Sequence, residues 1–119
     1  MKRDRAIELL DDSDLVLSIQ VLQEFYVQAT RATRSDALPH ALAVLLIEKW
    51  SRFPIQDMTL AVFHVALRIR DTHRLSFWDS TIIAAALAQG CDTLYTEDLN
   101  HEQVVEGLRI VNPFRRALV

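Results

Sequence analysis

Cysteine, glycine, proline and lysine are all scarce in this chain of 119 residues. Cys91 is the only cysteine, which excludes an internal disulfide and favours a reducing, cytoplasmic compartment. Glycine and proline together number five, whereas half of the residues are hydrophobic, and this balance excludes a disordered tail. No apolar run approaches the roughly 18 residues of a membrane span, and the charged start lacks the core of a secretory signal. We therefore expect one cytoplasmic domain over residues 1–119, with no membrane association.

A surplus of positive charge is also missing, since the formal net charge is −3. This argues against a protein that coats nucleic-acid phosphates without selectivity. Lys2 and Lys49 are the only lysines, so almost all basic residues are arginines. Arginine binds phosphate bidentately, which is consistent with a local basic rim. A bias of the genome toward arginine codons explains the composition equally well.

What the chain does contain is an alternation of short apolar runs with helical patterns. Runs bounded by turn signals predict strands at 15–19, 93–96 and 108–111 and an extended piece at 53–55. Apolar spacing predicts helices at 4–11, from 18 or 20 to 31–34, from 35 or 36 to 50, from 59 to 69 and from 76 to 90, with a helical turn at 102–106. This order predicts a three-layer α/β fold with a parallel sheet, whose ligands bind beyond the carboxyl ends of the strands.

An acidic residue lies in the first turn of the predicted helix after Ser76. Asp79 comes three residues after Ser76 and before an apolar run, which is the spacing of a capping box. Asp79 would then serve only its own helix and the helix dipole. A capping box prefers Glu or Gln at this place, so Asp fits it less well. The spacing leaves both a capping role and a ligand role open.

Other acidic residues follow two predicted strands. Glu24 lies about a turn and a half into the helix after strand 15–19, and the helical wheel does not place it clearly on the solvent face. A carboxylate near a buried face is costly unless it is paired or metal-bound, and pairing with Arg31 is the alternative. Asp98 follows strand 93–96, where acidic residues also form turns. Glu97 is the less favoured ligand, because adjacent residues at a strand end point apart.

These carboxylates are expected at one edge of the sheet, where helix N-termini and strand carboxyl ends meet. Clustered carboxylates repel one another, and hard cations such as Mg²⁺ prefer oxygen ligands. Such a cation can activate water for attack on a phosphodiester. His73 and His101 lack the spacing of a metal pair and are interpreted as surface or interface residues. No Walker loop, GxGxxG or GxSxG is present, and Cys91 is interpreted as a packing residue.

Several motifs together resemble one known family. The run SFWDSTIIAAALAQGCDTLYTEDLNH, the following GLRIVNPF and the upstream SIQVLQEFYVQATR resemble PIN-domain proteins from Lys2 to Phe114. The resemblance implies a three-layer α/β/α fold and a ribonuclease that depends on Mg²⁺ or Mn²⁺. Glu24, Asp79 and Asp98 match three of the family's four acidic positions. Thr96 matches the hydroxyl residue often found before the last acid, with Glu97 in a supporting position.

The chain departs from the family at its start. PIN domains begin with a central strand that carries the first acid, whereas MKRDRAIELL resembles the helix after that strand. We therefore expect an N-terminally truncated PIN-like domain, and Asp4 is no substitute for the missing acid. A start codon placed too far downstream is the favoured explanation. A decayed gene, or a fragment that borrows a strand from a partner or a second copy, are the alternatives.

The resemblance implies two candidate functions. The first is the toxin of a VapBC-type toxin–antitoxin pair, a homodimeric endoribonuclease held inactive by a cognate antitoxin, with weak or no activity in the 119-residue form. The alternative is a degenerate, non-catalytic PIN module that binds antitoxin or RNA. Trp50, Phe63 and Trp78 belong either to the core or to a dimer interface, and the core is the favoured interpretation.

Overall fold

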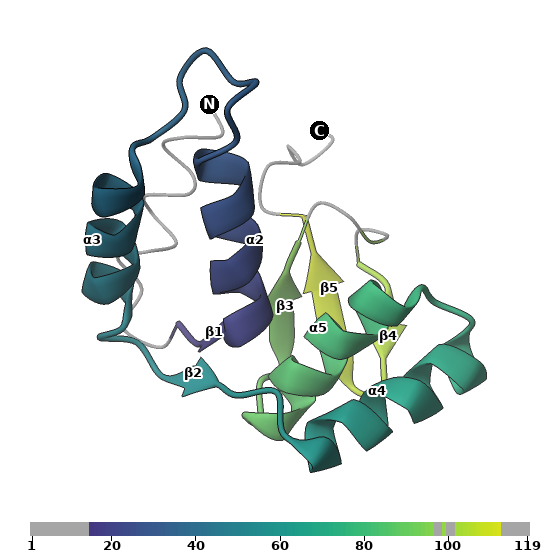
Figure 1. Ribbon diagram of the computed structural model, residues 1–119. Coiled ribbons are helices and arrows are strands. Elements are labelled where there is room, and N and C mark those ends of the chain that lie inside the picture. The colour runs from purple at the N-terminus through teal and green to yellow at the C-terminus, as the bar shows by residue number, and fades with distance from the viewer. Residues whose placement is uncertain (1–14, 97–98, 100–101, 113–119) are drawn as a thin grey trace, which may run out of the picture.

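The computed structural model describes residues 15–96, 99 and 102–112. The predicted helix at 4–11 therefore lies outside the described residues. The elements follow in the order β1 (Leu17–Ser18), α2 (Ile19–Ala29), α3 (His40–Trp50), β2 (Ile55–Gln56), α4 (Leu60–His73), α5 (Phe77–Ala88), β3 (Thr93–Tyr95), β4 (Val104–Val105) and β5 (Leu108–Val111). Two pairs of helices thus lie between short strands along the chain, and the α/β class is confirmed (Figure 1).

The strands of the described residues form two separate sheets. In one, β1 pairs with β2 in parallel, with Leu17 opposite Ile55. In the other, the order is β3-β5-β4, with β3 parallel to β5 and β4 antiparallel to it. The expectation of a single parallel sheet is therefore met only in part, because the described strands divide into two sheets and include one antiparallel pair.

A tight hairpin between β4 and β5 replaces the helical turn predicted at 102–106. Val105 pairs with Leu108, so only Glu106 and Gly107 form the loop. Both have positive φ, 52° and 86°, as in the two-residue turns that match the twist of a hairpin. The helical prediction was wrong because Gly107 and the apolar Val104 and Val105 favour a turn between strands.

The main core lies between the α4–α5 pair and the three-stranded sheet (Figure 1). Its most buried large side chains are Ile69 of α4, Ile83 of α5, and Leu108 and Ile110 of β5, each with no exposed surface. Leu108 and Ile110 alternate with exposed Arg109, as expected for a strand with one buried face. Burial of this kind supplies the main stabilisation of the fold.

Helices α2 and α3 form a second pair, and the rings of Phe25 and Trp50 contact each other at a centroid distance of 4.5 Å. Helix α3 begins at His40, later than the predicted 35 or 36. The residue before a proline is disfavoured in helical conformation, and Pro39, with φ −60° and ψ 148°, occupies the N-cap. Arg34 instead pairs with Asp36 at 3.0 Å in the preceding loop.

The predicted helix starts at 18, 59 and 76 are confirmed, whereas neither Ser35 nor Asp36 caps α3. The Ser18, Thr59 and Ser76 side chains accept hydrogen bonds from the backbone N–H three residues later, at 3.1 to 3.2 Å. Helix α5 ends at Ala88, and Gly90 follows with a φ of +71°. Such bonds satisfy backbone donors that the first turn of a helix leaves unpaired.

The core interpretation was wrong for Trp78, whose side chain is 66% exposed. Neighbouring helix residues point about 100° apart. Phe77 takes the more sheltered position and contacts the Trp78 ring edge-on at 5.1 Å. Trp50 and Phe63 are half-buried. Among the described residues, no helix is long and apolar enough to cross a membrane.

Candidate functional site

Asp79 lies in the first turn of α5, and its side chain is half-buried. Its backbone N–H donates to Ser76 Oγ at 3.1 Å, so the first half of the predicted capping box is present. Within the described part of the chain, no hydrogen bond to the Asp79 carboxylate is formed. The carboxylate is thus available to a ligand, while the negative charge still suits the helix N-terminus.

Glu24 lies on α2, about a turn and a half after β1, and is exposed. The expectation that it lies near a buried face was therefore wrong. Its partner is Gln20, one turn earlier, rather than Arg31: Gln20 Nε2 donates to Glu24 Oε1 at 3.2 Å. Because Gln20 is uncharged, it does not neutralise the carboxylate.

Gln20 and Thr81 connect α2 with the first turn of α5. Gln20 Nε2 also lies 3.3 Å from the carbonyl oxygen of Trp78, and the Thr81 hydroxyl donates to Gln20 Oε1. Both residues are buried, with 7% and 2% exposure. This connection brings Glu24 to the helix turn that carries Asp79. Sequence reasoning missed both residues, although a glutamine one turn before an acidic residue is a spacing at which helix side chains meet.

The third acidic position comes two residues after Thr96 in the sequence. Asp98 and the supporting Glu97 lie outside the described residues. Thr96 directly follows β3, and its backbone N–H donates to the carbonyl oxygen of Val111 at 3.0 Å. Thr96 therefore lies at the carboxyl end of its strand, as the prediction required.

The described acidic residues are of the type that binds a hard divalent cation. They are too few to hold one without further ligands. Glu24 and Asp79 offer carboxylate oxygens, the ligands that such cations prefer. Among the described residues, however, no group of three or more His, Cys, Asp or Glu is arranged to hold a metal. The described part of the site thus provides two carboxylate groups, and a bound cation would need further ligands.

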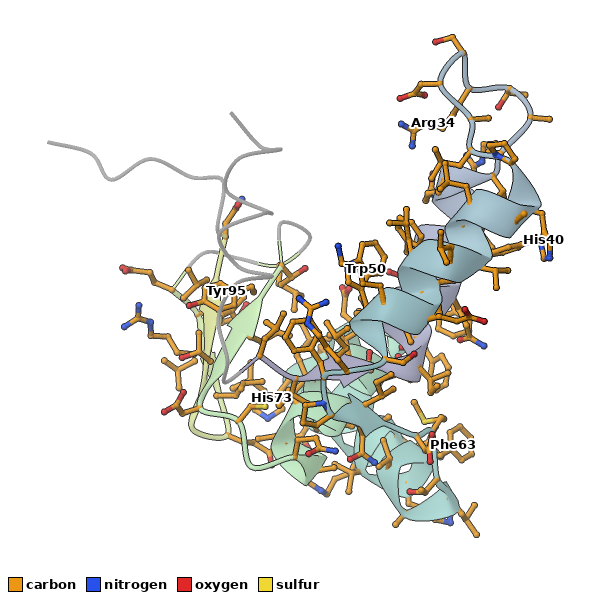
Figure 2. All side chains as sticks on the ribbon, turned by 90° about the vertical axis from the view of Figure 1, so that its left-hand side faces the viewer. Arg34, His40, Trp50, Phe63, His73 and Tyr95 are labelled. Carbon is orange, nitrogen blue, oxygen red and sulfur yellow. The ribbon has the colours of Figure 1, made fainter. Side chains whose placement is uncertain are left out.

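An apolar groove of about 510 Å³ separates the two sheets. One wall includes β1 and the start of α2, and the other includes β3. The lining residues include Leu15, Val16, Leu17, Val21, Phe25, Trp50, Ala85, Leu94 and Tyr95, of which Trp50 and Tyr95 are labelled in Figure 2. Helix α5 contacts β1, β2, β3 and β5, so it holds the two sheets beside each other. Among the described strands, β1 and β3 each have one neighbour, which leaves one edge of each without a strand partner.

Cys91 lines the same groove. Burial raises the pKa of its thiol, and the neighbouring Asp92 raises it further. A raised pKa keeps the thiol protonated, so the interpretation as a packing residue rather than a nucleophile agrees with the structure.

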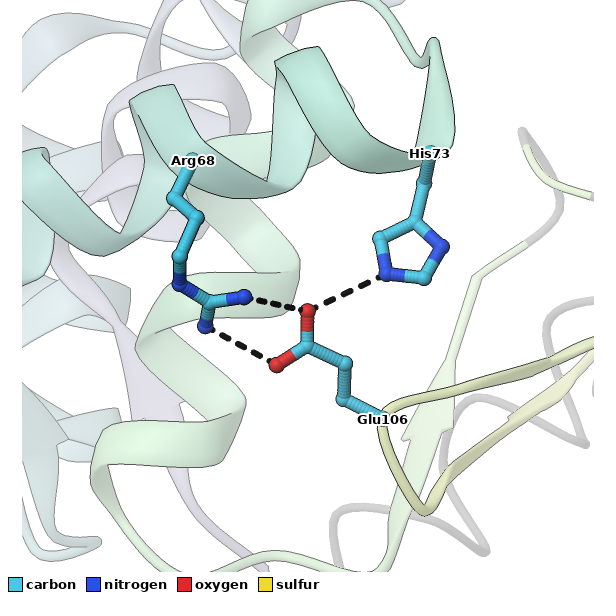
Figure 3. A network of polar contacts seen from close by, with 3 residues as sticks. All are labelled: Arg68, His73 and Glu106. Carbon is cyan, nitrogen blue, oxygen red and sulfur yellow. Dashed lines mark hydrogen bonds and ion pairs between the residues drawn. The ribbon is translucent and has the colours of Figure 1, made fainter.

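The remaining histidine candidates do not join this site. His73 Nε2 lies 3.1 Å from Glu106, which also accepts two bonds from Arg68, and this network connects α4 to the β4–β5 hairpin (Figure 3). His73 thus contacts another element of the described fold and does not join the acidic site. His101 lies outside the described residues.

Comparison with known protein families gives a match. No curated protein matches the chain. Among protein families, residues 2–107 match the PIN domain, which is generally a nuclease domain that uses divalent metals. The match spans most of the chain and includes Glu24, Asp79 and Asp98. On this match, the chain belongs to the PIN domain family.

Proposed function

We propose that this protein is a metal-dependent endoribonuclease of the PIN type, and the toxin of a toxin–antitoxin pair. The observation that carries the proposal is the bridge between Glu24 and the first turn of α5, within a chain that belongs to a family of nuclease domains. We assign Glu24, Asp79 and Asp98 as catalytic, metal-binding carboxylates. Thr96 and Glu97 support them.

The proposed chemistry follows from the donors. Glu24, Asp79 and Asp98 would hold Mg²⁺ or Mn²⁺, both of which accept carboxylate oxygens. When bound, the cation supplies activation of water and neutralisation of charge on the leaving oxygen. The protein contributes the fixed positions of the carboxylates. Asp79 is held by the capped first turn of α5, and Glu24 by its bond to Gln20.

We also propose that a further strand, outside the described residues, fills the groove between β1 and β3. Three observations support this: the groove has apolar walls, the described strands on its two sides each lack a second neighbour, and α5 contacts both sheets. A strand there would join the two sheets into one and complete a three-layer α/β/α domain. Its carboxyl end would add the fourth acidic residue. Without it, we expect the 119-residue form to have weak or no activity.

The proposed partners are RNA, a cognate antitoxin and a second copy of the chain. Exposed apolar side chains support protein partners, namely Val27 of α2, Leu42 and Leu45 of α3, and Leu60 of α4, which are 42 to 70% exposed. Large exposed apolar residues mark interaction surfaces when they gather in one place. Sedimentation equilibrium tests the homodimer: a concentration-independent monomer mass would contradict it. We place the protein in the cytoplasm.

The nuclease proposal is tested with purified protein and a structured RNA. Cleavage should require Mg²⁺ or Mn²⁺ and stop in the presence of a chelator. Glu24→Gln and Asp79→Asn remove one charge each with little change in shape, and both should reduce the cleavage rate to background. Glu48→Gln, an exposed charge change on α3, is the matched control and should leave the rate unchanged. Cleavage that survives both site substitutions would remove the basis of the proposal.

The strand proposal has its own test. The DNA immediately upstream of Met1 should encode, in frame, a short apolar run with an Asp at its end, and the longer protein should cleave faster. A stop codon or a frameshift at that place would contradict the version in which the strand comes from the same chain.

A non-catalytic PIN module that binds antitoxin or RNA is the second candidate. The observation in its favour is that the described residues bring only two acidic residues toward one site and contain no group of three metal ligands. Calorimetric titration with Mn²⁺ separates the two candidates. Specific binding that is lost in Asp79→Asn favours the nuclease, whereas RNA binding without metal binding favours the module.

A further inference from the structure

The side chain of Gln20 is the most completely bonded polar group of the described chain near the proposed site. Its Nε2 donates to Glu24 Oε1 at 3.2 Å and to the carbonyl oxygen of Trp78 at 3.3 Å. Its Oε1 accepts a bond from the Thr81 hydroxyl. Gln20 is 7% exposed, and a buried amide is stable only when its donors and acceptor are satisfied. These contacts satisfy both N–H groups and the carbonyl oxygen.

The orientation of this amide follows from its neighbours. Glu24 as a carboxylate and the Trp78 carbonyl can only accept hydrogen bonds, so the NH₂ end of Gln20 must face them. The carbonyl end then faces Thr81, the one neighbour with a proton to donate. The Thr81 hydroxyl also lies 2.6 Å from the Trp78 carbonyl oxygen, so its single proton is shared between these two acceptors. Two residues of α5 therefore determine which end of Gln20 meets Glu24.

The bond to Gln20 restricts a side chain that is otherwise free. Glu24 is exposed, and an exposed glutamate samples many rotamers. The bond occupies Oε1 and leaves Oε2 for another ligand. Because Gln20 is uncharged, it orients the carboxylate without neutralising it. An arginine or lysine in the same place would compete with a cation for the negative charge.

We propose that Gln20 is a positioning residue that holds the Glu24 carboxylate for a divalent cation, and that Thr81 fixes Gln20 in the required orientation. This inference rests on the proposed metal-dependent function and extends it to two residues that are not acidic. Partners of this kind, one bond away from a metal ligand, commonly change metal affinity by 10- to 100-fold. The contact of 3.2 Å is of ordinary length, so we expect an effect of about tenfold.

The test compares variants of the full chain. Gln20→Met keeps the length of the side chain and removes its donors, and Thr81→Val removes the hydroxyl while keeping the shape. Gln28→Met makes the same change at an exposed position of the same helix and serves as the control. The dissociation constant of Mn²⁺ is measured by electron paramagnetic resonance. The rotamer distribution of Glu24 is measured in the metal-free protein by NMR scalar couplings, and the thermal midpoint is recorded for each variant.

We expect about a tenfold weaker Mn²⁺ affinity in Gln20→Met, a smaller loss in Thr81→Val, and less than about a twofold change in Gln28→Met. Glu24 should occupy one dominant rotamer in the parent chain and several in Gln20→Met. Unchanged Mn²⁺ affinity and an unchanged Glu24 rotamer would overturn the proposal, even if the thermal midpoint falls, because a purely structural role predicts that result. If the parent chain binds no Mn²⁺, the proposed function fails, and the rotamer measurement alone then decides the role of Gln20. If Gln20→Met does not fold, Thr81→Val supplies the same comparison.

Discussion

Replacement of Glu106 by Gln removes the central charge of the network between α4 and the β4–β5 hairpin. Arg68 donates to both carboxylate oxygens at 2.7 and 2.9 Å, and His73 Nε2 lies at 3.1 Å (Figure 3). The hydrogen bonds from Arg68 are the main reason why the pKa of Glu106 falls from 4.5 to about 2. Glu106→Gln keeps the size of the side chain and its positive φ, so the substitution isolates the charge.

The expected loss is about 1 kcal/mol in the free energy of unfolding at neutral pH, the upper end for an ion pair near the surface. The pKa alone would suggest more, but the Arg68 side chain is 53% exposed and solvent screens the pair. The sign of the pH dependence follows from the lowered pKa. Between pH 4.5 and about 2 the unfolded chain binds the proton more tightly than the folded protein, so the stabilisation is complete above this range and disappears as the pH falls through it.

Urea denaturation of the parent chain and of Glu106→Gln, at about pH 7 and about pH 3, measures this effect. The difference between the two proteins should be largest at neutral pH, shrink at low pH, and decrease in about 1 M salt. Glu48→Gln, which removes an exposed charge of α3, should show no such dependence. Equal losses for Glu106→Gln at both pH values, or a loss no greater than that of Glu48→Gln, would refute the reasoning.

Three further substitutions test the fold. Ile83→Ala leaves a cavity in the core between α5 and the sheet, where Ile83 has no exposed surface, and should cost about 2–5 kcal/mol in urea denaturation, against about 1 kcal/mol for Ile83→Val. Gly107→Ala should cost about 1 kcal/mol, because φ is +86° while a Cβ meets no atom within 4 Å; a cost near zero would contradict the strained turn. Ser76→Ala removes the cap of α5 and should cost about 1 kcal/mol by thermal unfolding, whereas Asp79→Asn should cost less if Asp79 serves a ligand more than its helix.

The sequence predicted those elements whose signals are local. Ser18, Thr59 and Ser76 were recognisable as caps because a hydroxyl satisfies backbone donors only a few residues away. Strand 108–111 was recognisable by its apolar residues and the asparagine and proline after it. The later start of α3 and the β4–β5 hairpin were missed, although Pro39 and Gly107 each gave a local sign of them.

The candidate site was predictable only in part, because its connections join distant segments. Asp79 follows from the spacing after Ser76, and its first-turn position is confirmed. The exposure of Glu24 depends on how α2 packs, which the helical wheel did not determine. Gln20 and Thr81 are 61 residues apart, and no pattern within either helix indicates their contact. The groove between the sheets likewise depends on the packing of α5 against both.

The rate of RNA cleavage by the 119-residue chain and by its Asp79→Asn variant, with protein in excess and Mn²⁺ present, tests the central claim most directly. The account predicts slow cleavage by the parent chain that needs the metal, and a rate at background in the variant. Cleavage at equal rates by both proteins, or cleavage that persists in a chelator, would contradict it.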